Sequence, residues 1–321
     1  MVMRVLLTGA TGFVGRAVLE KLVAQAGRQV VVAARRPISS AAAVSTVRIA
    51  GIDGSTDWRE AVEGVDVVIH SAARVHVMNE AAADPLSEFR KVNVEGTLQL
   101  AREAARAGAR RFVFVSSIKV NGEGTAPGRP YQADDEPAPA DPYGISKQEA
   151  EQQLKALAVE TGMEVVIIRP PLVYGPGVKA NFLNMMRWLN KGVPLPLGSI
   201  DNRRSLVALD NLVDLIETCV AHPAAANQTF LVSDGEDLST SELLRRMARA
   251  LGKPARLLPV PMWLLESAAA LLGKRAFSNR LCGSLQVDIG KTRSLLGWTP
   301  PVGVDEALRK VAKHFMDIES K

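Results

Sequence analysis

Residues 8 to 15 read TGATGFVG and directly follow a short apolar run at residues 4 to 7. An amphipathic stretch comes next, so the order predicts a strand, a tight glycine turn and a helix. Gly9 permits the turn, Gly12 lets main chain approach a pyrophosphate, and Gly15 lets the helix pack closely on the strand. The stretch is typical of a site for a dinucleotide.

The surroundings of this turn decide between a ligand site and a purely structural β-α corner. A second apolar run at residues 30 to 34 closes a βαβ unit, which favours the dinucleotide site. The helix would offer free amide groups and the positive end of its dipole to phosphates. The residues predicted to bind the cofactor here are Gly9, Thr11, Gly12, Phe13 and Val14.

Two arginines follow the second predicted strand, at the position that distinguishes NAD(H) from NADP(H) binding. An acidic residue about twenty positions after the glycines would bind a free ribose 2′-hydroxyl. Arg35 and Arg36 occupy that region instead, and guanidinium groups bind phosphate well. We therefore expect NADP(H), with NAD(H) as the alternative if both arginines are solvated loop residues.

Composition indicates a globular protein with a full core. The chain has 321 residues, of which 47% are hydrophobic, and a formal charge of +5 without long charged runs. Nucleic-acid binding is not expected, because it needs a clustered basic face. Cys219 and Cys282 suggest neither a disulfide framework nor a metal site. We expect a cytoplasmic protein without a stable membrane insertion. Residues 259 to 272 are expected to form a packed helix, with contact to a membrane surface as the alternative.

Strands and helices alternate along most of the chain, which predicts an α/β fold with a Rossmann-type, doubly wound parallel sheet. A smaller, mostly helical C-terminal lobe would bind substrate. We expect residues 1–173 to form the dinucleotide-binding domain, with 205–233 returning to it. Residues 174–204 and 234–321 would form the substrate lobe. The further predicted strands are 44–49, 65–70, 111–115, 164–169, 205–209 and 229–232.

Small and polar residues mark two further positions near the expected cofactor. Ala72 and Ala73 follow a predicted strand, where either a close cofactor or tight packing would select small side chains. Asn93 lies inside a helix predicted over residues 85 to 107, although asparagine competes with the helix for hydrogen bonds. It would serve either as a packing residue or to hold a water near the active site.

Ser117, Tyr143 and Lys147 are the candidate catalytic residues. Tyr143 and Lys147 are four positions apart, so they share a helical face, and a cation there would stabilise a phenolate. Ser117, at the end of a strand, would bind the same substrate oxygen. The set is typical of proton transfer at a hydroxyl or carbonyl, coupled to hydride transfer from a nicotinamide. The alternative for the pair alone is an exposed helical pair.

The chain resembles the extended short-chain dehydrogenase/reductase family, of the NAD-dependent epimerase/dehydratase type that acts on nucleotide sugars. The matching strings are TGATGFVG, HSAA at 70 to 73, NVEGT at 93 to 97, FVSSIKVNG at 114 to 122, YGISK at 143 to 147, RPPLVYGPG at 169 to 177 and LGWTP at 296 to 300.

This resemblance implies roles for several residues. Ser117, Tyr143 and Lys147 would be the catalytic set, and Lys147 would also hold the nicotinamide ribose, with Pro170 nearby. Three positions correspond to contacts with the sugar nucleotide: Asn181, Arg204 and Arg280. A homodimer through the helices at 86 to 107 and 143 to 161 is also implied.

Departures from the family pattern indicate the reaction. Ile118 and Lys119 replace the Asp-Glu of sugar dehydratases, and Asn121 replaces a usual tyrosine. Arg35 and Arg36 favour reduction over epimerisation. The strings AARVHVM at 72 to 78, SSIKVNGEGT at 116 to 125 and DPYGISK at 141 to 147 resemble bacterial NADPH-dependent reductases of UDP-2-acetamido-2,6-dideoxy-4-keto-hexoses, which make UDP-QuiNAc or UDP-FucNAc for lipopolysaccharide O-antigen. The alternatives are a UDP-hexose or UDP-N-acetylhexosamine 4-epimerase with tightly bound NAD, and a dinucleotide-sensing regulator without turnover.

Overall fold

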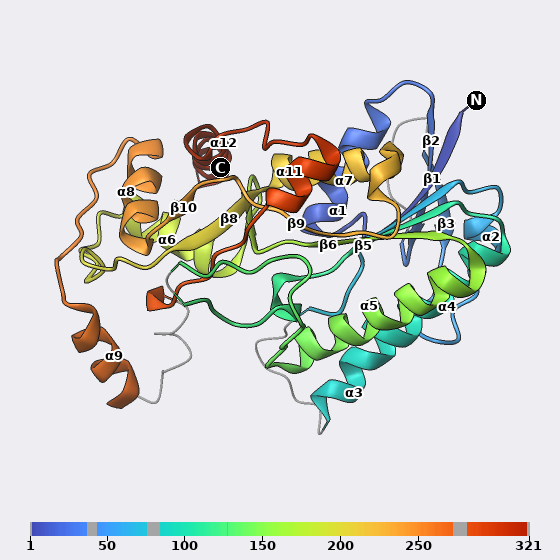
Figure 1. Ribbon diagram of the computed structural model, residues 1–321. Helices are drawn as coiled ribbons and strands as arrows, with labels where there is room; N and C mark the ends of the chain where they lie inside the picture. The colour runs from blue at the N-terminus through green and yellow to red at the C-terminus, as the bar shows by residue number, and fades with distance from the viewer. Residues whose placement is uncertain (1, 37–43, 76–83, 127, 272–280, 320–321) are drawn as a thin grey trace.

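The computed structural model describes residues 2–36, 44–75, 84–126, 128–271 and 281–319. Its centre is a seven-stranded sheet in the order β3-β2-β1-β4-β5-β6-β9, in which all neighbours pair in parallel (Figure 1). The strands are β1 (Met3–Thr8), β2 (Arg28–Ala34), β3 (Val44–Arg48), β4 (Val67–His70), β5 (Arg111–Val115), β6 (Glu164–Arg169) and β9 (Thr229–Leu231).

Helices cover both faces of this sheet, as the alternating sequence pattern predicts. Val5 and Leu7 of β1 pack in one core with α1 (Phe13–Val23) and α7 (Leu209–Ala221). Leu6 points to the opposite core, which is built with α2 (Arg59–Val62), α4 (Thr97–Arg106) and α5 (Pro142–Thr161). In Figure 1 the two helical layers lie above and below the sheet. The predicted doubly wound α/β fold is confirmed.

A second, three-stranded sheet has the order β10-β8-β7 and lies beside a third hydrophobic core. Its strands are β7 (Leu172–Tyr174), β8 (Arg204–Ala208) and β10 (Asp237–Leu238), and the core includes α6 (Ala180–Asn190), α8 (Thr240–Ala250) and α12 (Val304–Glu319). The prediction that residues 205–209 return to the main sheet is wrong. The edge of β6 is taken by β9, so β8 pairs with β7 instead. Two short helices lie next to β9. The helix η3 (Pro223–Ala225) precedes β9 in the chain, and α11 (Gly290–Leu296) packs on β9.

The helix predicted over residues 85 to 107 is divided into three parts. It comprises α3 (Pro85–Arg90), a π-helical segment η1 (Lys91–Gly96) and α4. Gly96 packs against residues 52 and 53, because a Cβ atom on Gly96 would lie 2.6 Å from the Ile52 side chain and 2.9 Å from the Asp53 nitrogen. The π-helix places Asn93 inside the molecule, where it is 1% exposed.

Helix α9 (Met262–Leu271) projects from the body of the molecule (Figure 1). Leu265 packs against the third core, but Met262, Trp263 and Leu264 are exposed. The expected packing is therefore seen for Leu265, but not for Met262, Trp263 and Leu264. In the described part of the chain, no helix has the length and hydrophobicity needed to cross a membrane.

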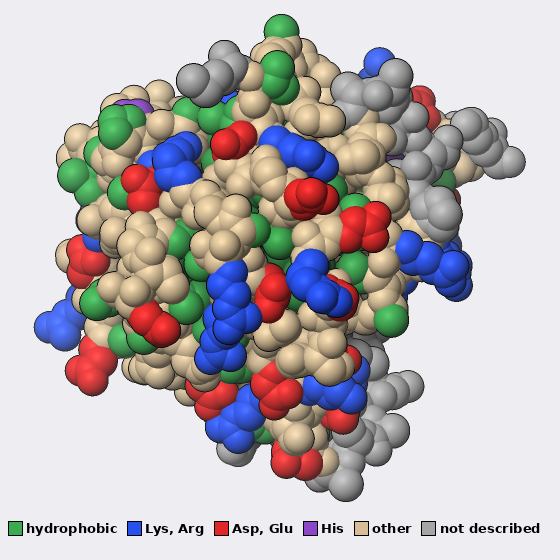
Figure 2. Space-filling model, turned by 90° about the vertical axis from the view of Figure 1, so that its right-hand side faces the viewer, with side chains coloured by type: hydrophobic (Ala, Val, Ile, Leu, Met, Phe, Trp, Pro, Cys, Tyr) green, Lys and Arg blue, Asp and Glu red, His purple; other side chains and the backbone are tan. Residues whose placement is uncertain are grey.

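The surface beside β1, β2 and α4 mixes charges of both signs. Figure 2 shows lysine and arginine side chains interspersed with aspartate and glutamate across this face. This mixture gives the face no single-sign field that would steer a highly charged polymer.

Candidate active site

The carboxyl ends of β1 and β4 lie side by side at the point where the strand order changes direction. Ligands of open α/β sheets bind in the crevice outside such a switch point. The glycine turn fills the β1 side of it. Gly9 has a φ of +77°, and a Cβ atom there would lie 2.7 Å from the Ala72 nitrogen. Glycine is required here because both the conformation and the space exclude a side chain.

The start of α1 has the form of a phosphate site. Gly12 precedes the helix and donates a 2.8 Å hydrogen bond to the Gly9 oxygen. Within the described residues no side chain caps α1, and its first turn holds no acidic residue. Thr11 and Gly12 are exposed, while Phe13 and Val14 are partly exposed. The amide groups of this turn can therefore meet a pyrophosphate, so the residues present fit a dinucleotide.

The end of β4 closes the crevice beside the glycine turn. The Ser71 hydroxyl donates to the Thr8 oxygen at 2.7 Å, and the Ala72 nitrogen donates to the Thr8 hydroxyl at 3.4 Å. Ala72 and Ala73 are partly exposed at this edge of the crevice. A contact of Ala72 and Ala73 with cofactor stays a prediction.

His70 is a buried polar residue that sequence reasoning passed over. Its ring nitrogens lie 2.7 Å from the Thr8 hydroxyl and 3.0 Å from the Thr97 hydroxyl. Burial lowers the pKa of His70 to about 3, and the nearby Lys147 charge acts in the same direction. The ring is therefore neutral and links β1, β4 and α4. A histidine that ends a continuous apolar strand was the available signal.

Asn93 connects two segments of the crevice. Its side-chain oxygen accepts from the Arg74 nitrogen at 2.8 Å, and its amide donates to the Arg74 oxygen at 3.0 Å. The same amide group donates to the Ser146 hydroxyl at 3.0 Å. Asn93 is thus a satisfied packing residue that ties the end of β4 to helix α5.

Tyr143 and Ser117 come together from α5 and the end of β5. Asp141 caps α5 by accepting from the Gly144 nitrogen at 2.7 Å, which places Tyr143 in the first turn. Ser117 begins the short helix η2 (Ile118–Val120). Burial raises the pKa of Tyr143 to about 12, whereas a hydrogen bond with Ser117 acts to lower it. The Tyr143 ring also lies edge-on to Phe89, with ring centres 6.0 Å apart.

Lys147 lies one helical turn further along α5 and is 1% exposed. Its ammonium donates to the Val115 oxygen at 2.9 Å and lies 4.2 Å from the centre of the Phe114 ring. Burial lowers the pKa of Lys147 to about 7, while the Glu151 carboxylate acts to raise it. The structure therefore brings a phenol, a hydroxyl and a buried amine to one place. These three side chains together can transfer a proton to or from a substrate oxygen when the Lys147 amine is protonated.

The remaining predicted residues occupy different surroundings. Pro170 is buried at the end of β6, where its oxygen accepts from the Ile118 nitrogen at 3.0 Å. Arg204 is partly buried at the start of β8 and donates to the Gly283 oxygen at 3.0 Å. Asn181 is exposed in the first turn of α6. Arg280 lies outside the described residues.

Arg35 and Arg36 are both exposed in a bend that follows β2. Residues 37–43, which come next in the chain, lie outside the described part. The position of the two arginines at the carboxyl end of β2 suits either a bound phosphate or solvent, so it gives no preference for NADP(H).

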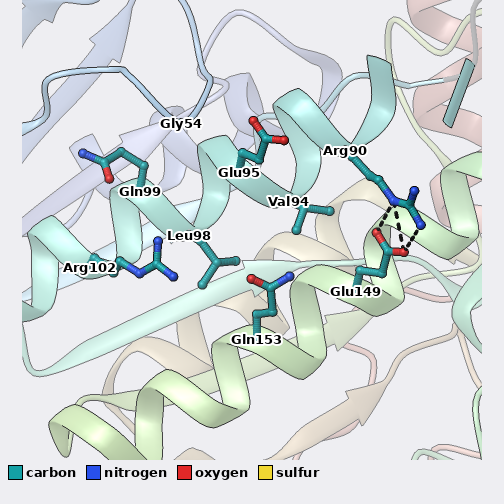
Figure 3. A pocket seen from close by; sticks show the side chains of 9 residues that line it. All are labelled: Gly54, Arg90, Val94, Glu95, Leu98, Gln99, Arg102, Glu149 and Gln153. Carbon is teal, nitrogen blue, oxygen red and sulfur yellow. Dashed lines mark hydrogen bonds and ion pairs between the residues drawn. The ribbon is translucent and has the colours of Figure 1, made fainter. Parts of the chain in front are cut away.

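The open groove in Figure 3 lies away from the three candidate catalytic residues. It has a volume of about 550 Å³ and runs between η1, α4 and α5. Arg90 and Glu149 face each other across one end, joined by hydrogen bonds of 2.5 to 3.1 Å. Its lining residues are Gly54, Arg90, Val94, Glu95, Leu98, Gln99, Arg102, Glu149 and Gln153. The groove therefore belongs to the outer surface of the helical layer.

Comparison with known proteins places this geometry in a family. Residues 5–233 match the NAD dependent epimerase/dehydratase family. The chain is 49% identical over 318 residues to a UDP-glucose 4-epimerase of Vibrio cholerae, covering 99% of this chain and 97% of that protein. A UDP-glucose 4-epimerase of Mycolicibacterium smegmatis is 29% identical over 98% of each chain.

Solved structures show the same fold. The UDP-glucuronic acid 4-epimerase of Bacillus cereus, in complex with NAD, superposes with a TM-score of 0.79 at 19% identity, over 98% of this chain and 99% of that one.

These findings correct two expectations. The 4-ketoreductase prediction is wrong, because the 49% identical relative is an epimerase. The preference for NADP(H) finds no support, because the matching family is described by NAD. The preference for NADP(H) depended on Arg35 and Arg36, and an exposed arginine after β2 does not by itself define a phosphate site. The ketoreductase expectation depended on the same arginines and on short strings shared with one subgroup of the family.

Proposed function

Because the chain belongs to the NAD dependent epimerase/dehydratase family, we propose that it is an NAD-dependent 4-epimerase of a UDP-hexose. UDP-glucose is the first substrate to test, and UDP-N-acetylglucosamine is the second. The 49% identity to an epimerase over nearly the whole chain is the observation that carries this proposal. The convergence of Ser117, Tyr143 and Lys147 supports it, because such a reaction needs a proton acceptor at the sugar oxygen.

The proposed roles of these residues follow from their surroundings. Tyr143 removes the proton from the sugar 4-hydroxyl as C4 is oxidised, and it returns a proton to the same oxygen after the sugar has turned. Ser117 donates a hydrogen bond to that oxygen and orients it. Lys147, as an ammonium, stabilises the Tyr143 phenolate, since the pKa of the phenol is raised to about 12 by burial.

NAD, when bound, would supply reversible hydride transfer at the sugar C4. The glycine turn at residues 9 to 15 binds its pyrophosphate, and Lys147 binds the nicotinamide ribose. Ala72, Ala73 and Pro170 line the path of the cofactor. Because the hydride is returned, the reaction needs no net oxidant.

The sugar nucleotide occupies the side of the molecule that holds the small sheet. We assign residues 174–204 and 234–321 to this substrate lobe, together with β8, which pairs with β7 in the small sheet. Arg204 and Arg280 supply positive charge for the diphosphate, and Asn181 supplies an amide. Arg204 suits this role, because burial lowers its pKa and an anion would offset the cost of its charge.

The test is a direct assay of the purified protein. UDP-glucose is incubated with the protein without added cofactor, and the products are followed by NMR. UDP-galactose should accumulate to equilibrium, and the protein should release NAD after denaturation. A protein that binds NAD yet converts neither UDP-glucose nor UDP-N-acetylglucosamine would contradict the proposal.

We also propose that α4 and α5 form a two-fold interface between copies of the chain. The groove of Figure 3 lies between these helices, and its lining mixes Val94 and Leu98 with charged side chains. A self-complementary contact can place such a face against its own copy. Dimerisation is therefore expected in solution.

A further inference from the structure

Four buried polar residues form a cluster directly behind the candidate active site. They are Ser116, Asn121, Glu151 and Arg169, and we call them the Glu151 cluster. Each of these side chains is at most 4% exposed. The catalytic scheme above uses none of them.

The Glu151 cluster joins the three segments that carry the proposed site residues. Ser116 precedes Ser117, Glu151 lies one helical turn after Lys147, and Arg169 precedes Pro170. These segments belong to β5, α5 and β6, which are far apart in sequence. Contacts within the cluster therefore fix the relative positions of the segments.

Ser116 and Arg169 both donate short hydrogen bonds to the Glu151 carboxylate. The Ser116 hydroxyl donates to one carboxylate oxygen at 2.5 Å, and the Arg169 Nε donates to the same oxygen at 3.0 Å. The Arg169 Nη2 donates to the other oxygen at 2.6 Å. This is a bidentate pair, the geometry in which an arginine holds a carboxylate most firmly.

Arg169 also reaches the segment between η2 and α5. Its Nη1 donates to the Asn121 side-chain oxygen at 3.0 Å and to the Ala133 oxygen at 3.4 Å. The Asn121 amide donates to the Gln132 oxygen at 2.9 Å. One guanidinium thus holds both the proposed catalytic helix and the loop that precedes it.

Lys147 receives its electrostatic environment from several elements. His70 of β4 is neutral and stacks on the Phe114 ring, over which the Lys147 ammonium also lies. The Val115 oxygen of β5 accepts a hydrogen bond from the ammonium. Tyr143 of α5 is a neutral phenol in this structure because its pKa is raised. Ser117 is uncharged, and Arg169 of β6 faces Glu151. Glu151 is the group whose charge favours the ammonium against burial.

A structural purpose alone explains this arrangement poorly. Buried ion pairs contribute little net stability, because desolvation offsets their attraction, and apolar residues often replace them without loss. The position of the Glu151–Arg169 ion pair, one helical turn from Lys147, suggests a role in the active site instead.

We propose that Glu151 is a positioning residue that keeps Lys147 charged and aligned, and that Arg169 and Ser116 hold Glu151 in place for this purpose. The proposal rests on the proposed function, since it assigns Lys147 the role described above. Glu151 lies one helical turn from Lys147 on α5, and the Arg169 guanidinium also bonds to the loop at residues 121 to 133.

The decisive measurement titrates Lys147 without any turnover. NMR of lysine Cε resonances is followed against pH in the protein without cofactor, with Lys147 assigned by its loss in Lys147→Met. In Glu151→Gln the titration midpoint should move to lower pH by about half a unit or more, because a nearby negative charge is removed. An unchanged midpoint would overturn the proposal.

Kinetics supply a second readout that a merely structural role would not move. In Glu151→Gln, kcat for UDP-glucose at neutral pH should fall about tenfold, with a smaller change in KM. The alkaline limb of the kcat profile should shift to lower pH, because the Lys147 ammonium is lost at a lower pH. Glu217→Gln is the matched control, because Glu217 pairs with Arg28 in a partly buried ion pair on α7. This control should leave the pH profile unchanged.

A second variant tests the proposal if Glu151→Gln does not fold. The double variant Glu151→Met with Arg169→Met removes both charges and keeps the volume apolar, which such sites tolerate. It should move the Lys147 titration in the same direction but by less, because the Arg169 cation is removed as well. A wild-type midpoint would also overturn the proposal. If Tyr143→Phe retains epimerase activity, the proposed function fails. If Tyr143→Phe is inactive and Glu151→Gln titrates and turns over like the wild type, only the positioning role fails.

Discussion

The side-chain amide of Asn93 donates a hydrogen bond of 3.0 Å to the hydroxyl of Ser146, which joins the π-helix η1 to helix α5. Ser146 in turn donates to the Tyr143 oxygen at 2.8 Å. The π-helix therefore supports the turn of α5 that carries both Tyr143 and Lys147. Single π-helical turns often occur at functional sites.

Asn93→Ala should lower both the free energy of unfolding and the affinity for NAD. The substitution leaves the Arg74 nitrogen and oxygen without their partner, which costs about 1 to 3 kcal/mol of unfolding free energy. Urea unfolding measures the loss, and NAD titration measures affinity. Ser146→Ala is the comparison, because it removes only one of the three bonds and should destabilise less. Equal stability of Asn93→Ala and wild type would contradict this account.

Tyr143→Phe should lose epimerase activity by about 100-fold or more, because the proton carrier is removed. The fold and NAD retention should be preserved, since the ring contact with Phe89 remains. The assay is conversion of UDP-glucose, with NAD content measured in the same sample. Tyr131→Phe serves as the matched control. It removes a hydroxyl that donates to the Gly124 oxygen at 2.6 Å, so it should cost about 1 kcal/mol of stability without a comparable fall in kcat.

Gly15→Ala should disrupt the glycine turn. An added Cβ atom would lie 2.1 Å from the Gly9 oxygen, so the turn and α1 would have to separate. We expect a strong loss of NAD affinity, measured by calorimetry, and a lower melting temperature. Gly303→Ala is the control, because a Cβ atom there meets nothing within 4 Å among the described residues. Normal NAD binding by Gly15→Ala would show that this close approach is not required.

His70 should make stability depend on pH. Its pKa is about 3 in the folded protein and near 6.5 when unfolded, so only the unfolded chain gains a proton between these values. Its contribution is complete above about pH 6.5 and is lost as pH falls toward about 3, at up to about 1.4 kcal/mol per pH unit. Urea unfolding of wild type and His70→Gln at several pH values isolates this contribution. The variant should show the shallower dependence, and parallel curves would refute the assignment.

Gln153→Arg should disturb the proposed interface. The groove balances two arginines against two glutamates, Glu95 and Glu149, so the added arginine leaves one unbalanced positive charge on each copy and disfavours their contact. Light scattering should show a shift from dimer to monomer. Gln152→Arg is the control, since Gln152 is exposed on the same helix but is absent from the groove lining. A dimer that persists in Gln153→Arg would place the interface elsewhere.

Local patterns in the sequence determined the main sheet and the candidate site. The glycine turn depends on residues 9 to 15 alone, and the facing of Tyr143 and Lys147 depends on helical periodicity. Short apolar runs predicted all seven strands of the parallel sheet, because both faces of such strands are buried. The family resemblance added Ser117 at the end of β5.

Tertiary structure alone decided the features that depend on partners distant in sequence. Strand β8 looked suited to the main sheet, but β9 occupies the free edge of β6. The buried Asn93 side chain has its hydrogen-bond partners on Arg74 and Ser146, which no local pattern reveals. The pairing of Glu151 with Arg169 likewise appears only when α5 packs on β6. Sequence period sets which face a side chain occupies, whereas the charge and hydrogen-bond partners it meets are set by the segments that pack against that face.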